Sequence, residues 1–571
     1  MRASSLSKRA IALSLSSLLA IALPAAADEP EILFRFPAGG VVNSGPELEG
    51  GRVWFISDSK TLYIMTEGGR AIGKRDINVR RVPFIACDPY GRAVIPDGAS
   101  AILMVNKAGQ EVWRTELGAS PAGPPAFGLD GRLYAAAGGK VLCLAPNGLR
   151  LWSRELGGDF LSLVGPGPGG GPLIALSDGS VLLYSPDGAL LWREGFQSQA
   201  RHMATRGSEV FLAFADGTLA AFTPLVRAPG TGTATGAAAG VALPPLGSAL
   251  EALAAGPDGY YVLGASGRLL ALGTGGEELW RAETGALASG AARLFAFKGR
   301  VVLASRSRVR SYGPDGALFR DLSIRNATGL PALTKGGAVL SGGSDWILYA
   351  YRFERELEGL ARERPAILDR QAVKDAGKRA LLWYPGGSSD DTVLSMLADI
   401  EKSLKSGTIG EGASEALLLA SAVALGELEA PFGAGALARG PSPRGALARA
   451  TACEVLGALG FPAAVELLAE VIARDADPAV RAAAASAVAA IGLDPEGKAL
   501  DAFAAEAARG RLDARTGRAL IDAIEALYRA GGGLDNPSGA LALLRIAGGA
   551  SYPGDLRRRA EAALRRISAP Q

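Results

Sequence analysis

The phrase SPDGALLWREGF, residues 185–196, decides the fold because copies of it recur along the first half of the chain. In four of the five copies an Asp-Gly, Asn-Gly or Gly-Gly pair supplies the positive φ angles of a tight turn. The residues after the pair alternate as in a strand, and the aromatic residue is expected to pack inward. The other copies are NKAGQEVWRTELG (106–118), APNGLRLWSRELG (145–157), GTGGEELWRAETG (273–285) and GPDGALFRDL (313–322).

A second hairpin precedes the phrase, as in GGPLIALSDGSVLLYS (170–185), so each unit contains about four strands. The aromatic residues set the period, with spacings of 39, 40, 88 and 39 residues, and 88 corresponds to two units. A four-stranded unit with a period near 40 is typical of a β-propeller blade. The aromatic residues are Trp113, Trp152, Trp192, Trp280 and Phe319.

The number of central hairpins predicts an all-β propeller with eight blades over residues 28–353, and seven blades is the alternative. The fifth unit is the weakest, because its last strand would fall in APGTGTATGAAAG (228–240), which is typical of a loop. The hairpins lie near residues 52–65, 92–105, 131–144, 172–184, 209–222, 260–272, 300–312 and 337–351.

The two ends of this region complement each other. Phe34 lies in EILFRFPAGG, a last-strand phrase without the three strands before it, whereas residues 329–353 supply three strands without a last one. We therefore expect an N-terminal strand, residues 31–36, to complete the last blade. Closing the ring in this way removes the unpaired edges of an open array.

The segment DGSVLLYSPDGALLWREGF resembles the pyrroloquinoline-quinone (PQQ) type of propeller repeat, whose pattern is DGxLYAxDxxTGxxLWxxxxG. The resemblance covers residues 30–353 and implies that each Trp docks one blade against its neighbour. The quinone-dependent dehydrogenases of this family use an adjacent Cys-Cys pair and acidic calcium ligands, and this sequence has no Cys-Cys pair. This sequence is therefore expected to have the propeller architecture of the family without its quinone cofactor. We assign no catalytic, cofactor-binding or metal-binding residue.

The second half of the chain changes character after a charged linker, ERELEGLARERP (354–365). Alanine becomes dominant and the apolar period approaches 3.6, which predicts helices over residues 366–571. In DADPAVRAAAASAVAAIGLDP (475–495), Asp477 is a natural N-cap and Gly492 a natural C-cap. The phrase DPAVRAAAASAVAAIG resembles the short HEAT repeat, which implies an all-α HEAT-like solenoid.

The first 27 residues have the pattern of a signal peptide. Basic residues precede the short apolar run AIALSLSSLLAIAL (10–23), and three alanines, 25–27, precede Asp28. The run is shorter than the ~20 residues that span a membrane, so we expect cleavage, a periplasmic or secreted protein and no integral span. Removal of three positive charges from a net charge of +3 leaves about zero, which disfavours nucleic-acid binding.

Few residues suggest a catalytic, metal-binding or anion-binding role. His202 is the one histidine, and we interpret it as an ordinary strand or loop residue. The three cysteines, Cys87, Cys143 and Cys453, are odd in number and far apart, so we expect small buried apolar residues and at most one disulfide. Three arginines alternate in SRSRVRS, a pattern more typical of a solvated strand face than of an anion site: Arg306, Arg308 and Arg310.

The sequence is therefore most consistent with an exported, non-catalytic scaffold of the cell envelope that binds another protein. The propeller of the bacterial outer-membrane protein assembly machine is similar at the level of fold. This chain lacks that protein's lipid-anchor cysteine and adds a solenoid. Two alternatives remain open: a degenerate quinoprotein-like or other propeller enzyme, and a carbohydrate or cell-wall binding protein.

Overall fold

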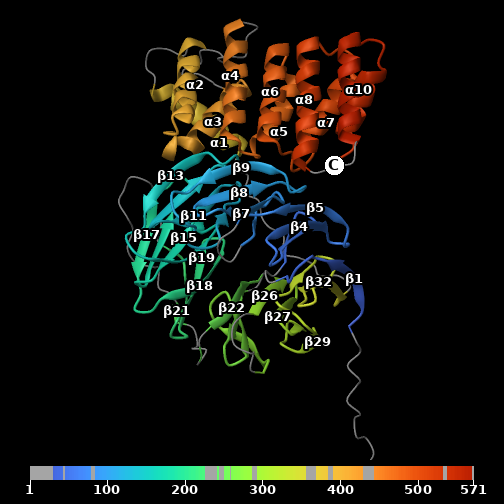
Figure 1. Ribbon diagram of the computed structural model, residues 1–571. Coiled ribbons are helices and arrows are strands. Elements are labelled where there is room, and N and C mark those ends of the chain that lie inside the picture. The colour runs from blue at the N-terminus through green and yellow to red at the C-terminus, as the bar shows by residue number, and fades with distance from the viewer. Residues whose placement is uncertain are drawn as a thin grey trace, which may run out of the picture.

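The computed structural model describes residues 30–42, 46–78, 84–224, 241–242, 248, 250–256, 259–285, 292–354, 368–383, 390–427, 443–531 and 536–568. It consists of a propeller of eight four-stranded antiparallel sheets and a layer of helices that lies against one side of it (Figure 1). The prediction of eight blades is confirmed, and the alternative of seven is wrong.

The first four blades follow the chain without interruption. Their strands are β2 (Glu47–Glu49), β3 (Arg52–Ile56), β4 (Thr61–Thr66) and β5 (Ala71–Asp76); β6 (Ala86–Cys87), β7 (Ala93–Asp97), β8 (Ala101–Val105) and β9 (Glu111–Glu116); β10 (Ala126–Phe127), β11 (Leu133–Ala137), β12 (Lys140–Leu144) and β13 (Arg150–Glu155); β14 (Phe160–Val164), β15 (Leu173–Leu176), β16 (Ser180–Tyr184) and β17 (Leu190–Gly195).

The other four blades complete the ring. Their strands are β18 (Ala200–Arg206), β19 (Glu209–Phe214), β20 (Leu219–Phe222) and β21 (Val241–Ala242); β22 (Leu250–Ala255), β23 (Gly259–Gly264), β24 (Arg268–Gly273) and β25 (Glu278–Glu283); β26 (Ala292–Phe297), β27 (Arg300–Ser305), β28 (Arg308–Tyr312) and β29 (Leu318–Ser323); β30 (Ala332–Leu333), β31 (Ala338–Gly342), β32 (Ile347–Arg352) and β1 (Ile32–Pro37).

Blade five departs from the sequence prediction. Its last strand, β21, is only two residues long and follows the segment 228–240 instead of lying within it. Val241 is β-branched and suits a strand, whereas the glycines and alanines before it have weak strand preference. Residues 228–240 lie outside the described residues.

The eighth sheet joins the two ends of the propeller sequence. Strand β1 pairs antiparallel with β32, so that Phe34 lies opposite Ala350 and Phe36 opposite Leu348. The backbone N–H of Arg352 donates to the carbonyl of Glu31 over 2.8 Å. The outermost strand of this blade is therefore held by strand pairing and not by a covalent turn.

Neighbouring blades are joined where an aromatic ring of one blade packs on a turn glycine of the next blade. The turns after β12 and β16 hold Gly148 at φ +86° and Gly188 at φ +87°, and a Cβ at either position would lie 2.7 to 2.8 Å from the ring of Trp113 or Trp152. The ring nitrogens of these tryptophans donate to the carbonyls of Pro146 and Pro186 at 2.9 and 2.8 Å. Only glycine fits at such a turn, because it tolerates positive φ and has no Cβ.

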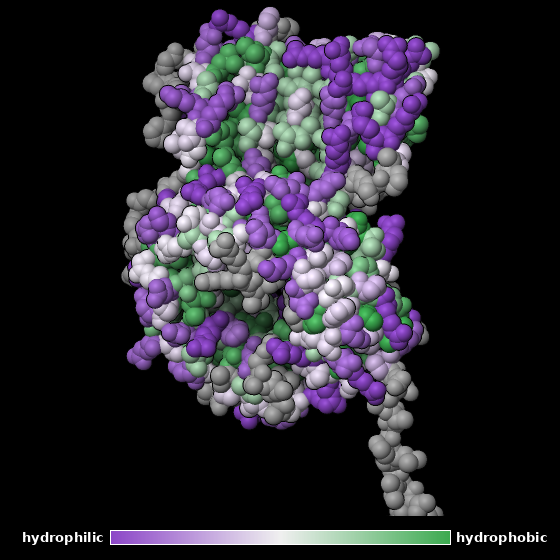
Figure 2. All heavy atoms as spheres, viewed as in Figure 1, coloured by the Kyte–Doolittle hydropathy of each residue, from purple (hydrophilic) through white to green (hydrophobic). Residues whose placement is uncertain are grey.

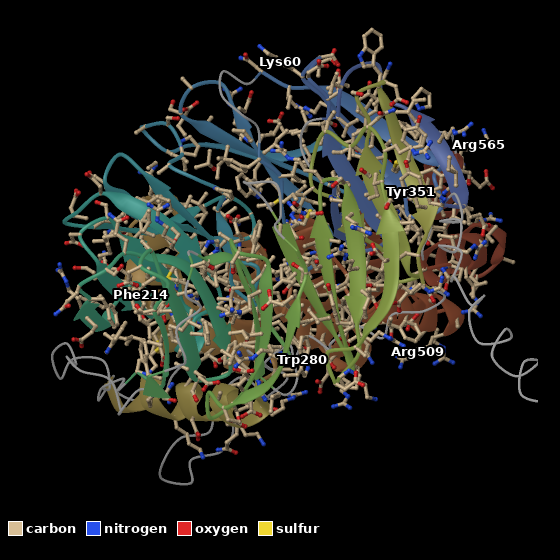
Figure 3. The ribbon with its side chains drawn as sticks, turned by 90° about the horizontal axis from the view of Figure 1, so that it is seen from below. Lys60, Phe214, Trp280, Tyr351, Arg509 and Arg565 are labelled. Atoms are coloured by element: carbon tan, nitrogen blue, oxygen red, sulfur yellow. The ribbon has the colours of Figure 1, made fainter. Side chains whose placement is uncertain are left out.

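Two further pairs repeat this arrangement. Trp280 on β25, labelled in Figure 3, lies against Gly316, and Phe34 lies against Gly69; a Cβ at either glycine would be 2.8 Å from the ring. The docking role that the PQQ-type resemblance implied for the tryptophans is therefore present at Trp113, Trp152 and Trp280. It also extends to Phe34, which takes the same position on the strand that closes the ring.

Phe319 is an exception to the expected inward packing, since 57% of its surface is exposed. In the strand register, Arg320 opposite Ser311 corresponds to Trp152 opposite Cys143, so Phe319 lies one residue before the tryptophan position, at the bulge of β29. Leu279 has the same place on β25 and is 52% exposed. The expectation that this aromatic packs inward is therefore wrong, because Phe319 follows its turn glycine by three residues, whereas Trp152 follows Gly148 by four.

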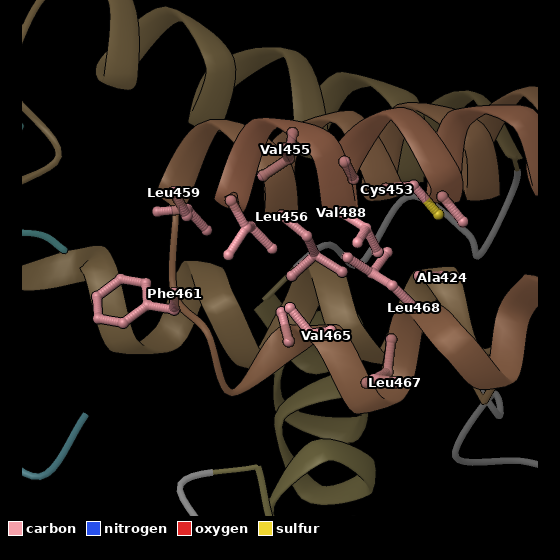
Figure 4. Close-up of a cluster of buried hydrophobic side chains, with 14 of the residues drawn as sticks. Ala424, Cys453, Val455, Leu456, Leu459, Phe461, Val465, Leu467, Leu468 and Val488 are labelled. Carbon is pink, nitrogen blue, oxygen red and sulfur yellow. The ribbon is translucent and has the colours of Figure 1, made fainter. Parts of the chain in front are cut away.

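The helices form two rows (Figure 1). The rows pack through buried aliphatic residues such as Val455, Leu456 and Leu468 (Figure 4). No helix among the described residues is long and apolar enough to cross a membrane. The helices are α1 (Arg370–Trp383), α2 (Asp390–Lys405), α3 (Ala413–Ala424), α4 (Pro443–Leu459), α5 (Ala464–Arg474), α6 (Pro478–Ile491), α7 (Lys498–Ala508), α8 (Ala514–Gly531), α9 (Ser538–Gly548) and α10 (Gly554–Ser568), with the short 3₁₀ helices η1 (Pro168–Gly170) and η2 (Gly410–Gly412).

The predicted caps of α6 are present. The side chain of Asp477 accepts a hydrogen bond from the N–H of Ala479 over 2.7 Å, and Gly492 ends the helix at φ +68°. These caps fix the ends of a helix that packs between α4 and α8. The sequence prediction of an all-α HEAT-like domain is therefore confirmed.

Removal of β1 tests the closure of the ring. Deletion of residues 28–37 leaves the edge of β32 unpaired and uncovers buried side chains such as Phe55 and Leu348. We expect soluble oligomers or aggregates in size-exclusion chromatography with light scattering, since an exposed edge recruits other chains. Deletion of residues 1–27 alone is the control. A monomer with an unchanged melting temperature would contradict this account.

A matched pair of substitutions tests the aromatic contact. Trp152 is 4% exposed, whereas Phe319, which lies one residue before the corresponding position of its blade, is 57% exposed. We expect Trp152→Ala to lower the free energy of unfolding by about 3–5 kcal/mol, as for other buried aromatics. Phe319→Ala should change it by less than about 0.5 kcal/mol. Urea denaturation measures both, and equal losses would refute the assignment of the ring contact.

Candidate interaction platform

The turns of the repeated phrase also reach the helices. The Nδ2 group of Asn147 donates to the carbonyl of Ala458 over 2.8 Å, and that of Asn106 donates to the carbonyl of Arg529 over 3.2 Å. Both carbonyls lie in the last turn of a helix, α4 or α8. Carbonyls in the last turn lack partners within the helix. The turn asparagines of blades two and three therefore cap the helices that stand on the propeller.

The turn of blade four carries an aspartate instead of an asparagine, and it contacts the N-terminal end of a helix. Asp187 accepts a hydrogen bond from the hydroxyl of Ser414 over 2.8 Å. Ser414 is the second residue of α3, and the positive end of a helix dipole favours a carboxylate. The residue before the turn glycine therefore matches the polarity of the helix end that it contacts.

A buried arginine lies at the centre of this contact. Arg132 is 1% exposed and follows the turn between β10 and β11. Its guanidinium lies 3.1 Å from Asp130 and 3.1 Å from Asp187, and it donates to Ser414 over 2.7 Å. The guanidinium carbon is also 5.1 Å from the ring centroid of Phe461, which follows α4. One side chain thus joins two blades to two helices.

The charges of this cluster are balanced by pairing. Burial raises the pKa of Asp130, and the positive charge of Arg132 opposes that rise. Burial alone would lower the pKa of Arg132, but Asp130 and other neighbours keep it above its usual value. A buried charge is tolerated when it is paired and hydrogen-bonded. Loss of the arginine would leave two carboxylates without a counter-ion.

The apolar core also crosses the boundary between the domains. One continuous cluster contains Tyr134 and Trp152 of blade three, Ile174 of blade four, and Leu417 and Phe461 of the helical part. Figure 4 shows Phe461 at the margin of the helical core, beside the propeller. Since separation of the two domains would expose this cluster to water, they form one structural unit.

Two clefts lie beside this contact, between helix ends and blades. The first encloses about 390 Å³ and is lined on the propeller side by Tyr90 and Leu129. Both clefts share Tyr90 and the loop 494–496 after α6. Asp494 in that loop accepts from the N–H of Leu500 over 2.9 Å, and burial raises its pKa. This carboxylate is thus engaged in capping α7.

The structure separates the other residues that the sequence singled out. Arg308 and Arg310 lie 2.8 and 3.3 Å from Asp321, which balances part of their charge, and Arg306 is exposed. This arrangement agrees with a solvated strand face. His202 lies on β18, and burial lowers its pKa.

The three cysteines are free thiols. Cys143 and Cys453 are buried as expected, and burial raises the pKa of both; Cys87 is only half-buried, which corrects the expectation for it. Cys87 lies on β6, the short innermost strand of its blade, which is less covered than the central strands. Within the described part of the chain, no cluster of three or more histidine, cysteine, aspartate or glutamate residues could hold a metal ion.

Sequence reasoning missed the residues of the platform. The repeated pattern predicts Asn147 and Asp187 only as turn residues, and it singles out neither Asn106 nor Arg132. A signal was present: Gly-Arg follows the first strand of several blades, at 91–92, 131–132 and 299–300. A long cationic side chain placed next to a turn glycine in successive repeats indicates a contact beyond the turn.

Comparisons with known proteins agree with this architecture. A family model described as outer membrane protein assembly factor BamB matches residues 98–225, and a model of HEAT repeats matches residues 436–527. The chain combines a PQQ-type propeller with HEAT-like repeats. No curated protein matches it in sequence.

Solved structures resemble the propeller. The computationally designed protein Ika8 is 17% identical with a TM-score of 0.45, and the match covers 57% of this chain and all of Ika8. BamB from Moraxella catarrhalis is 16% identical with a TM-score of 0.43, over 57% of this chain and 98% of BamB. The C-terminal WD40 domain of Sif2 is 11% identical with a TM-score of 0.46, over 57% of this chain and 99% of that domain.

Substitution of the buried arginine tests the interface. Arg132→Met removes the counter-ion of Asp130 and Asp187. We expect it to lower the free energy of unfolding by about 3–5 kcal/mol, as for other broken buried ion pairs. Hydrogen exchange should also accelerate at the start of α3, where Ser414 loses a partner. The control is Arg114→Met, because Arg114 pairs with Asp97 at 2.9 Å but its side chain is 49% exposed; its loss should stay below about 1 kcal/mol. Equal effects of the two substitutions would contradict the interface.

Proposed function

We propose that this protein is an exported, non-catalytic scaffold that binds another protein in the cell envelope. The observation that carries the proposal is the joined platform: helix ends fixed on the turns of blades two to four by Asn106, Asn147 and the Arg132–Asp187 pair. Two repeat arrays held in one orientation offer a long surface of fixed shape. Solenoid surfaces of this kind commonly bind proteins.

The location in the envelope is supported by sequence. Residues 1–27 have the basic, apolar and small-residue order of a signal peptide. The family model that matches residues 98–225 describes an assembly factor of the outer membrane. An exported protein with this propeller would work among proteins of the envelope.

The helical part offers the more distinctive surface. Figure 2 shows hydrophilic residues gathered over α8 and α10, whereas α4 and α6 present hydrophobic and neutral residues on the same face. Leu541 and Leu544 are 44% and 57% exposed on α9, and Leu447 is 55% exposed on α4. Exposed leucines at a spacing of three residues lie on one side of a helix, where a partner could cover them.

The experiment uses the full chain with a C-terminal tag, produced in a bacterium with an outer membrane. We expect the purified protein to begin at Asp28, as measured by mass spectrometry. After cross-linking in cells, we expect one envelope protein to co-purify in stoichiometric amount. The double variant Leu541→Glu, Leu544→Glu should reduce its recovery several-fold. The matched control is Lys378→Glu, because the side chain of Lys378 is 53% exposed on α1.

Other outcomes would replace the proposal. A chain that keeps residues 1–27 and fractionates with the cytoplasm would refute export. If no protein co-purifies, and the chain reduces a dye in the presence of pyrroloquinoline quinone or hydrolyses a screened substrate, the enzyme alternative is correct. Retention on purified cell-wall material without a protein partner would favour the carbohydrate-binding alternative.

A further inference from the structure

The helices α8 and α10 carry a strong excess of positive charge. Together they contain eight arginines, four acidic residues and no lysine. The rest of the chain does not share this excess, since all 571 residues together have a net charge of only +3. Figure 2 shows the hydrophilic side chains gathered over these two helices. Such a charge asymmetry within one chain indicates a charged interaction surface.

The two helices meet along a row of ion pairs. The Nη2 group of Arg559 on α10 donates to both oxygens of Asp522 on α8, over 2.7 and 2.9 Å. Arg566 donates through Nε and Nη2 to the two oxygens of Glu525, over 2.6 and 2.9 Å. The second pair has the bidentate geometry in which a planar guanidinium matches a carboxylate. These pairs show how arginines of this surface engage carboxylates.

Four arginines beside this row have no such partner. Arg515 and Arg518 are exposed on α8, and Arg558 and Arg565 are exposed on α10. None of the four forms an ion pair with another residue in the described part of the chain. Their charges are therefore balanced only by solvent and salt.

The four unpaired arginines border the row of ion pairs. Arg515 and Arg518 each precede an acid of the row by seven residues, which is two helical turns, so they lie on the same side of α8. Arg558 and Arg565 each directly precede an arginine of the row. The starts of the two helices are level, because a Cβ at Gly517 would lie 2.6 Å from Leu556. We call these four arginines the basic strip.

The basic strip lies where the helices themselves disfavour cations. Arg515 is the second residue of α8, at the positive end of the helix dipole. Two acids at this end offset part of the charge. Asp513 caps α8 and lies 3.6 Å from Arg481, and Asp555 is exposed in the first turn of α10. An anionic ligand would relieve the repulsion that remains among the arginines.

We propose that the basic strip binds an acidic segment of the partner protein, rich in aspartate and glutamate. This inference rests on the proposed function, since it specifies how a protein partner is recognised. The carboxylates of the segment accept from the strip the hydrogen bonds that Asp522 and Glu525 accept from Arg559 and Arg566. Complementary charge of this kind speeds association and selects the partner.

An anionic membrane fits the basic strip less well. Helices that lie on a membrane place leucine or aromatic side chains toward the bilayer. No large apolar side chain of α8 or α10 is exposed, and the exposed leucines among the described helices lie on α4 and α9. The strip would therefore hold a membrane by charge alone, whereas a protein segment supplies carboxylates at fixed spacing for the planar guanidinium groups.

The probe is fluorescein-labelled deca-glutamate, with deca-glutamine as the neutral comparison. We expect the mature full chain to bind deca-glutamate in fluorescence anisotropy and not to bind deca-glutamine. Binding should disappear in about 1 M salt, which screens exposed charges. The double variant Arg518→Glu, Arg558→Glu should weaken binding at least about tenfold, and the milder Arg518→Gln, Arg558→Gln should weaken it in the same direction.

The matched control is the double variant Arg320→Glu, Lys378→Glu. It changes the net charge by the same amount at exposed positions on β29 and α1. It should change the affinity for deca-glutamate less than about twofold. Equal effects of the two double variants, or absence of wild-type binding, would overturn the proposal. Strip-dependent binding to phosphatidylglycerol vesicles without binding to deca-glutamate would also overturn it, in favour of a membrane contact.

A photo-reactive residue in place of Arg558 separates this proposal from the proposed function. Cross-linking in cells to the co-purifying envelope protein, within a segment that has more acidic than basic residues, would support both. If that protein cross-links only from other positions, or through a segment without net negative charge, the scaffold function stands and the strip proposal is wrong. If nothing co-purifies while deca-glutamate binds through the strip, the binding site exists and the scaffold function fails.

Discussion

The structure depends on one contact, an aromatic ring seated on a glycine turn of the next blade. At Gly148 and Gly188 a Cβ would lie within 2.8 Å of the ring, so the ring and the backbone are in direct contact. This contact sets the distance between blades. It also fixes the turn in space, because a buried tryptophan such as Trp152 cannot move without opening a cavity.

The same turn has a second role that follows from its geometry. While the glycine faces the ring, the residue just before it, Asn147 or Asp187, faces away from the blade and contacts a helix end. In each antiparallel sheet, the turn between the first two strands and the turn between the last two strands lie at the same end. Arg132, beside the first turn of blade three, can therefore reach Asp187 in the last turn of blade four. The helices are thus positioned by the same turns that join the blades.

Much of this architecture could be predicted from the sequence, but contacts between residues far apart in the chain could not. The number of central hairpins predicted eight blades, and the position of Phe34 indicated a strand that lacks the rest of its blade; β1 indeed pairs with β32. Asp477 and Gly492 predicted a helix because caps act through nearby backbone groups. The contact of Asn147 with Ala458 could not be predicted, because it joins residues 311 positions apart and neither belongs to a shared pattern.

The closing strand shows how one topological choice completes the ring of blades. A ring closed by strand pairing has no free sheet edge at that blade, and its two ends are held together by backbone hydrogen bonds such as that between Arg352 and Glu31. The same closure replaces one turn by two chain ends. Phe34 on the closing strand keeps the aromatic contact of the repeat, since its ring lies on Gly69 of blade one. The closing strand therefore joins blade eight to blade one by the same contact that joins blades two to four, and it does so without a covalent turn in its own sheet.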